Sequence, residues 1–209
     1  SNGTTNCTGG DTSTNWCTSC TYSHTCTGTD LILFVGVAGD TTDNEPTVTY
    51  AGTGMTLIDK IPPSGDRWLY LFYLINPATG ANDVVITVST TKISACASYT
   101  GVKQSAQPDN SAKSAVAAAS VTETLTPVDT GCWAIIWGGN DLNPMIAGTG
   151  TTQRQALNAN VLGDSNAIIS GSTSMTVQGD PTANQCAAIM ASFSPVPDAP
   201  FWQFVWGQE

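Results

Sequence analysis

From residue 31 onward the chain alternates short apolar runs with turn residues, a pattern that predicts an all-β protein. The runs are rich in β-branched and aromatic residues, and Gly, Pro, Asn and Asp separate them at intervals of about 8 to 12 residues. A dozen short strands with no convincing helix indicate an antiparallel β-sandwich. The expected strands span residues 31–37, 47–50, 55–61, 68–76, 84–89, 93–101, 115–125, 132–138, 145–152, 167–170, 175–178 and 185–193.

Two of these strands differ in how they distribute apolar side chains. Residues 93–100 alternate strictly, so we expect the face with Ile93 and Tyr99 to be packed and the Ser/Cys/Thr face to be wet or lightly covered. Residues 68–75 are apolar on both faces and therefore need two covers. One is the opposite sheet. The other is a terminal segment, a ligand, a long loop of the same chain or another subunit. If another subunit covers the strand, Trp68, Tyr70 and Phe72 form an assembly interface.

Residues 1–30 form a Cys/Thr-rich N-terminal segment with 10 Thr and 4 Cys but no Val, Ile, Leu, Met, Phe or Ala. Such a segment cannot build a core and must be ordered by disulfides, by a metal or by lying on a neighbour. We expect disulfide stapling, while zinc bound near His24 and free thiols remain alternatives. The cysteines concerned are Cys7, Cys17, Cys20 and Cys26.

The sandwich domain is expected to span residues 31–196, and residues 197–209 form an aromatic C-terminal tail. Four aromatic side chains crowd into six tail residues, namely Phe201, Trp202, Phe204 and Trp206. An exposed segment this apolar would aggregate unless it docks. It either folds back over its own chain or adds to a neighbouring subunit, so these residues join the predicted assembly interface.

Charge narrows the possible partners. Charged residues make up 11% of the 209-residue chain, against a usual value of ~25%, and the net charge is −10. This balance argues against nucleic-acid binding and against an anionic membrane surface. The longest apolar runs have about eight residues, too short for a membrane span of ~20. Crowded cysteines favour an oxidising location, so we expect an extracellular, cell-surface or virion protein.

Few residues of the chain are candidates for catalysis or for binding a metal or a sugar. The single histidine, His24, lies in the core-less segment, where a catalytic triad would lack rigid support, so no catalytic residue is assigned. Asp40, Asp43 and Glu45 could place carboxylates around calcium, although ordinary turn chemistry also explains them. Trp133 and Trp137 share one face of a predicted strand, either as core or as a platform for stacking sugars.

Three segments carry a resemblance to a known family. These are residues 47–58 (TVTYAGTGMTLI), residues 76–85 (NPATGANDVV) and residues 98–102 (SYTGV), together with the apolar run at 68–74 and the final Phe193-Ser194-Pro195. In this order they resemble a recurring β-sandwich domain of phage structural proteins and of secreted proteins of uncultivated bacteria. The resemblance covers residues 31–196. It implies a jelly-roll-like surface or assembly module and brings no catalytic residue with it.

The sequence therefore predicts a non-enzymatic extracellular or virion structural protein, a subunit that self-assembles or decorates a filament, shell or fibre. Its expected partners are copies of itself or a larger virion or cell-surface assembly. The alternative is a carbohydrate-binding or adhesion module that reads glycans with exposed Trp or Tyr, possibly with calcium. A polysaccharide-active enzyme is a third and weaker hypothesis.

Overall fold

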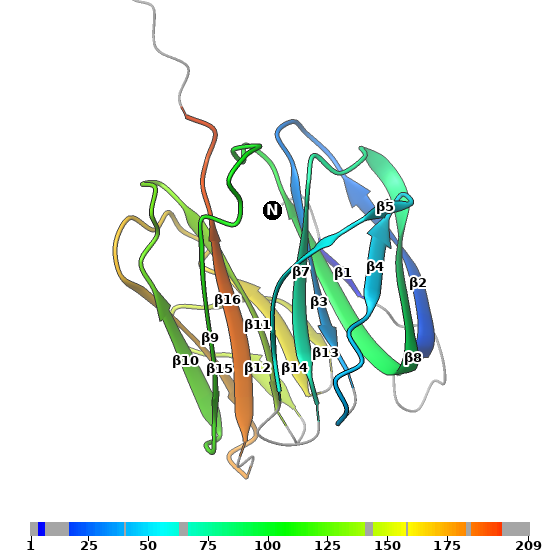
Figure 1. Ribbon diagram of the computed structural model, residues 1–209. Helices are drawn as coiled ribbons and strands as arrows, with labels where there is room; N and C mark the ends of the chain where they lie inside the picture. Colours follow the sequence, from blue (N-terminus) through cyan, green and yellow to red (C-terminus); the bar gives the residue numbers. More distant parts are fainter. Residues whose placement is uncertain are drawn as a thin grey trace, which may run out of the picture.

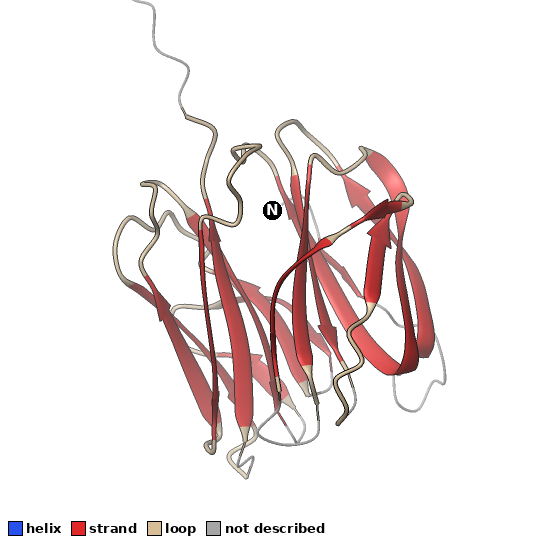
Figure 2. Ribbon diagram, viewed as in Figure 1, coloured by secondary structure: helices blue, strands red, loops and turns tan. Residues whose placement is uncertain are grey.

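The computed structural model describes residues 4–6, 17–39, 41–62, 67–140, 144–157, 159–182 and 185–197, and for residues 4–6, 17–19 and 89–92 the backbone alone (Figure 1). Every regular element in this part of the chain is a β-strand (Figure 2), and every pair of neighbouring strands is antiparallel. The predicted all-β class is confirmed. The described part of the chain contains no helix that could cross a membrane.

The strands form three hydrogen-bonded sheets. The eight-stranded sheet has the order β5 (Thr53–Gly54), β4 (Thr47–Tyr50), β8 (Gly80–Tyr99), β3 (Ile32–Ala38), β7 (Leu69–Ile75) and β6 (Thr56–Ile61), with β1 (Thr4–Asn6) and β2 (Cys17–Cys26) also paired to β8. The five-stranded sheet has the order β13 (Thr152–Leu157), β14 (Asn160–Asp164), β11 (Trp133–Asn140), β16 (Cys186–Phe193) and β9 (Asn110–Val116). The three-stranded sheet has the order β10 (Ser120–Leu125), β15 (Thr173–Gly179) and β12 (Met145–Ala147).

The long strand β8 divides the eight-stranded sheet into two layers. Its first half pairs with β2 and β4, and its second half pairs with β3, with Ala97 opposite Phe34. Side chains from the two halves pack against each other, because Val84 and Ile86 belong to the same buried cluster as Val35. Figure 1 shows β8 turning back between the two groups of strands. The protein therefore consists of four stacked β layers.

Each gap between layers holds its own apolar core. The outer and inner halves of the eight-stranded sheet enclose the first core. The inner half and the five-stranded sheet enclose the second, in which Phe34, Leu71 and Trp137 are buried. The five- and three-stranded sheets enclose the third, which contains Ile136 and Met175. The central strands of the two middle layers, β3, β7, β11 and β16, are covered on both faces, which explains why their sequences are almost continuously apolar.

A glycine brings the two middle layers into close contact. The face of β3 that points toward β11 carries Ile32 and Phe34, and Gly36 follows in the same alternation. The indole of Trp137 lies against Gly36, and its Nε1 donates a hydrogen bond of 3.2 Å to the carbonyl oxygen of Val37. The missing Cβ of Gly36 therefore makes the space that the largest buried side chain fills.

Strand β7 is covered twice, as its sequence requires, and both covers belong to the same chain. Leu69 and Leu71 point into the second core. Tyr70 and Phe72 are 0% and 3% exposed and point into the first core, beneath β2, β4 and the first half of β8. The prediction that Tyr70 and Phe72 form an assembly interface is therefore wrong, because the outer layer of the chain itself shields them from water.

Most predicted strands occur, with several differences in their bounds. Strand β4 has the predicted limits, whereas the two strands expected at 84–89 and 93–101 are one continuous strand, β8. The strand expected at 115–125 is divided between β9 and β10. The strand expected at 167–170 contributes a single bridge, between Ile169 and Cys132. Strands β1, β2, β5 and β14 were not predicted, and the strand expected at 145–152 contains β12 but only the first residue of β13.

Candidate functional site

An apolar cleft of about 270 Å³ opens at the end of the sandwich where β16 ends (the top in Figure 1). Its aromatic lining consists of Tyr99, Trp133 and Phe193, and its aliphatic lining includes Val102, Ile168 and Pro195. The ring centroids of Tyr99 and Phe193 lie 4.8 Å apart, and those of Tyr99 and Trp133 lie 6.2 Å apart. The cleft is therefore an opening into the second core, with aromatic rings at its base.

Exposed apolar side chains surround the cleft. Ile168, which lines it, is 70% exposed. Val196 directly follows the lining residue Pro195, and Val128 precedes the lining residue Gly131 in the same loop. These three account for all but one of the large hydrophobic residues that are exposed in the described part of the chain. Apolar surface gathered around an open cleft is typical of a binding site.

Backbone hydrogen bonds hold the walls of the cleft together. Val102 and Pro195 form an isolated bridge. The amide of Val196 donates to the carbonyl oxygen of Gly101 at 2.9 Å, and the amide of Lys103 donates to that of Ser194 at 2.9 Å. The segment that leaves β16 is thus attached to the loop that follows β8. This attachment fixes the cleft as a preformed feature.

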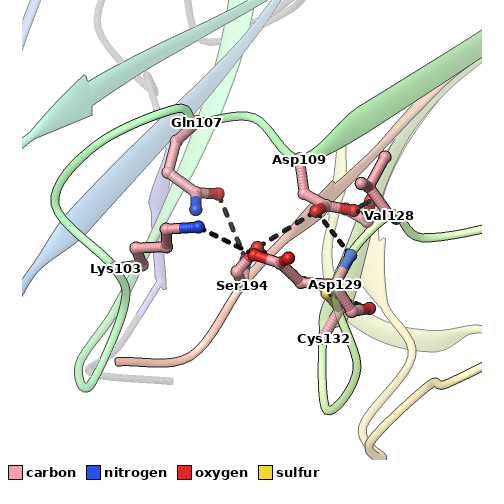
Figure 3. Close-up of polar contacts among 8 residues, drawn as sticks. Lys103, Gln107, Asp109, Val128, Asp129, Cys132 and Ser194 are labelled. Carbon is pink, nitrogen blue, oxygen red and sulfur yellow. Dashed lines mark hydrogen bonds and ion pairs between the residues drawn. The ribbon is translucent and has the colours of Figure 1, made fainter. Parts of the chain in front are cut away.

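A polar network beside the cleft, shown in Figure 3, fixes the loop of residues 126–131. The carboxylate of Asp109 accepts hydrogen bonds from the amides of Val128 (2.7 Å) and Asp129 (3.0 Å) and from the hydroxyls of Ser192 and Ser194 (3.1 Å each). Lys103 Nζ donates to Asp129 Oδ2 at 2.9 Å. These charges are directed at one another, so the network supports the cleft from the side.

Lys103 and Asp129 alter each other's acidity in the direction expected for an ion pair. The hydrogen bond to Asp129 raises the pKa of Lys103, and the same bond lowers the pKa of Asp129. Burial raises the pKa of the nearby Cys132 thiol. At neutral pH the lysine and the carboxylate are charged and the thiol is protonated. The arrangement favours neither a nucleophilic thiolate nor a free base.

A second polar group supports the base of the cleft from below. The hydroxyl of Tyr99 donates to Asp164 Oδ2 at 2.8 Å. Arg154 holds the same carboxylate with two hydrogen bonds, Nε to Oδ2 at 2.6 Å and Nη2 to Oδ1 at 2.8 Å. Asp164 is 0% exposed. A buried carboxylate and a bidentate guanidinium therefore fix the orientation of the Tyr99 ring.

No protein family, characterised protein or solved structure matches this chain significantly. The geometry of the site therefore has to indicate the function.

The chemistry of the cleft suits binding by burial. Its base is aromatic, Lys103 and Asp129 pair with each other, and the Asp109 carboxylate accepts hydrogen bonds from two backbone amides and two serine hydroxyls. Among the described residues, no group of three or more His, Cys, Asp or Glu side chains could hold a metal ion. The site can therefore take up an apolar side chain or a flat ring by removing its surface from water.

The histidine and the polar face of residues 93–100 are buried together. His24 is 2% exposed, and its Nε2 lies 2.9 Å from the hydroxyl of Ser98, which is 0% exposed. The hydroxyls of Tyr22 and Ser94 lie 2.9 Å apart. The face expected to be wet or lightly covered is thus covered by β2, and the histidine–serine pair is sealed from substrate. Burial lowers the pKa of His24 to about 4.

Burial of His24 predicts an acid-sensitive stability. The imidazole titrates near 6.5 in the unfolded chain but near 4 in the folded protein, so the unfolded state binds the proton first as the pH falls. Stability present above pH 6.5 is therefore lost between about pH 6.5 and 4. We expect His24→Gln, which cannot titrate, to lose about 2 kcal/mol less than the wild type between pH 7 and 4.5 in urea unfolding. Equal losses would contradict this role.

The cysteines differ from the prediction at one described position. Cys20 is buried and disulfide-bonded, and its partner is not among the described side chains. Cys7 lies outside the described residues, and of Cys17 only the backbone is described. Cys26 is a free thiol, so the disulfide predicted for it is wrong. Cys26 lies in the first core, where burial raises the pKa of the thiol.

Two of the three predicted calcium ligands form ion pairs with a lysine. Asp40 lies outside the described residues. Lys60 Nζ lies 2.6 Å from Asp43 Oδ2 and 3.2 Å from Glu45 Oε2, and the hydroxyl of Tyr70 donates to Asp43 Oδ1 at 3.1 Å. The two described carboxylates thus converge, as expected, but on an ammonium group. The hydrogen bonds to both carboxylates raise the pKa of Lys60.

The remaining predicted site residues fall into two groups. Phe201, Trp202, Phe204 and Trp206 lie outside the described residues, so their role stays a prediction. Trp68 is partly buried, stacks near Tyr70 and has Lys60 Nζ 5.7 Å from its ring centroid. Of the two indoles considered as a sugar platform, Trp137 is core and Trp133 lines the cleft. Sequence reasoning missed Ile168, whose signal is a large apolar residue in a polar loop.

Proposed function

We propose that this protein is a non-enzymatic structural subunit of jelly-roll-like design that assembles with copies of itself, as a secreted or virion component of a filament, shell or fibre. The observation that carries the proposal is the apolar cleft with its exposed apolar rim. A site of this kind gains free energy by covering surface, not by activating a reactive group. The resemblance of residues 31–196 to a domain of phage structural proteins supports the same role.

The sequence beyond the cleft adds a second reason. Pro197 borders the Lys103–Asp129 pair beside the cleft, and the sequence then continues into the aromatic tail. An apolar segment that follows directly after the cleft in the sequence favours association between copies.

The proposal predicts that assembly depends on the tail aromatics. We define the tail variant as the full chain with Phe201→Ser, Trp202→Ser, Phe204→Ser and Trp206→Ser. Static light scattering should show assemblies of at least twice the 21.6 kDa chain mass for the wild type and the monomer mass for the tail variant. Far-ultraviolet circular dichroism should be unchanged, because the described strands end at Phe193.

A matched control changes polar tail positions instead. Gln203→Ser with Gln208→Ser should assemble like the wild type. Equal assembly of the tail variant and the wild type would contradict the role of the aromatics, and a wild type that stays monomeric at every concentration would contradict self-assembly itself.

A further inference from the structure

We infer that the apolar cleft is the receptor for the aromatic tail of a second copy of this chain, so that copies join tail to cleft. The inference rests on the proposed self-assembly and names the two surfaces that meet. Its first support is the lining of the cleft. Tyr99, Trp133 and Phe193 form an aromatic base, and Ile168 is 70% exposed at the rim.

The size of the cleft restricts the occupant. A volume of about 270 Å³ lies below the range of about 300–1,000 Å³ that is usual for small-molecule sites. It suits one or two aromatic side chains. A sugar would need polar groups directed at its hydroxyls, whereas the charges nearby, Lys103 and Asp129, bind each other. An aromatic peptide therefore fits the cleft better than a glycan.

The tail supplies the required chemistry. Aromatic side chains bury about 150–250 Å² each, so four of them cover about 600–1,000 Å². A stable protein interface buries about 800 Å² on each partner. The cleft takes part of the tail, and exposed apolar side chains also lie in two segments that adjoin the cleft lining, at Val128 and Val196. The tail and the cleft thus match in chemistry, and the tail alone has enough apolar surface for a stable interface.

The described chain ends at the wall of its own cleft. Pro195 forms part of that wall and is held by its bridge to Val102. In the sequence only Asp198, Ala199 and Pro200 separate Pro197 from Phe201. A spacer this short would have to reverse the chain at once to bring Phe201 back to the same cleft, whereas the cleft of a second copy imposes no such constraint.

The receptor is preorganised. Asp109 fixes the loop of residues 126–131, and Asp164 with Arg154 fixes the ring of Tyr99. Binding therefore requires no ordering of the cleft, which leaves more of the burial free energy for affinity. Because the tail and the cleft are different surfaces, each copy has one of each. Such a contact repeats head to tail and yields a filament or a closed ring.

The decisive experiment mixes two full-length variants that are each defective in one surface. Ile168→Asp places a charge in the cleft and leaves the tail intact, while the tail variant has a cleft and no aromatics. The exposure of Ile168 makes its substitution compatible with folding. Each variant alone should be monomeric by light scattering, and their equimolar mixture should form a 1:1 heterodimer. Ile146→Asp, at an exposed position in β12, is the matched control and should assemble like the wild type.

A labelled peptide measures the same contact directly. A fluorescein-labelled peptide with the sequence of residues 198–209 should bind the tail variant, and adding Ile168→Asp to that variant should raise the dissociation constant at least tenfold in fluorescence anisotropy. Full-length protein that assembles regardless of Ile168→Asp would overturn the cleft as receptor while leaving self-assembly in place. A different pair of results is that the two variants form no heterodimer while Ile168→Asp changes the fluorescence of the tail in the monomer. That pair of results would show that the cleft holds the tail of its own chain and would overturn the second copy as its occupant. A wild-type protein that never assembles would contradict the proposed function itself.

Discussion

Replacing Arg154 by methionine should lower the free energy of unfolding by about 3–5 kcal/mol. Asp164 is 0% exposed and depends on Arg154 for two hydrogen bonds, of 2.6 and 2.8 Å. Methionine keeps much of the volume of the side chain but removes both donors and the charge. The carboxylate is then buried with two neutral donors, the hydroxyl of Tyr99 and the amide of Asn166, and the desolvation of the charge is no longer offset by a positive charge.

Urea unfolding followed by circular dichroism measures this loss. Lys113→Met is the matched control, because Lys113 pairs with Asp59 at 2.6 Å on the surface, with side chains that are 41% and 30% exposed. An exposed pair of this kind contributes about 0–1 kcal/mol. Arg154→Lys should fall between the two, since it keeps the charge but not the bidentate geometry. Losses for Arg154→Met no larger than for Lys113→Met would show that Asp164 is not held as described.

Replacing Gly36 by alanine should cost about 3 kcal/mol of stability, the upper part of the range for overpacking a core. A methyl group at Gly36 would lie 2.7 Å from Cε3 and 2.8 Å from Cγ of Trp137. The indole cannot retreat easily, because it is fully buried and its Nε1 is hydrogen-bonded to Val37. Either the ring leaves its place or the two middle layers separate.

The melting temperature should fall by several degrees, since about 1 kcal/mol corresponds to a shift of about 2–4 °C in a chain of this size. Gly54→Ala is the control. Gly54 also lies in a strand, and a methyl group there would contact nothing within 4 Å. Its effect should stay within about 0.5 kcal/mol. Similar effects at both glycines would contradict the close contact between the layers.

The sequence predicted β3, β7 and β16 because burial on both faces leaves a plain apolar run. It did not predict β2. That strand alternates Cys20, Tyr22 and other larger residues with Thr and Ser, and it is stabilised by hydrogen bonds such as His24 to Ser98 that depend on distant residues. Composition alone made the segment seem unable to join a core.

The sequence pattern also did not predict the number of layers. The polar centre of β8, with Thr90 and Lys92, was interpreted as a break between two strands, whereas the strand continues through it. Because that continuity folds one sheet over itself, Tyr70 and Phe72 are covered from within the chain. A strand that is apolar on both faces is predicted to be buried, but its sequence does not identify the segment that covers it.

The cleft could be predicted only in part. Trp133 was considered as a possible ring platform, and it is the partly exposed member of its strand. Tyr99 and Phe193 have ordinary core patterns, and their strands end at the cleft. The site arises where four segments meet: the loops after β8, before β11 and after β16, and the loop between β14 and β15 that contains Ile168. Such a meeting of loops depends on topology, which local periodicity does not encode.

The strand shared by two layers also determines how the molecule responds to tension. β8 has 20 residues. Its first half pairs with strands of the outer layer, and its second half pairs with strands of the inner layer. No loop separates the two halves. A pull on the N-terminal end acts first on β1, which pairs with the second half of β8, so the force reaches the inner layer before it can act on the pairing of β2 with the first half.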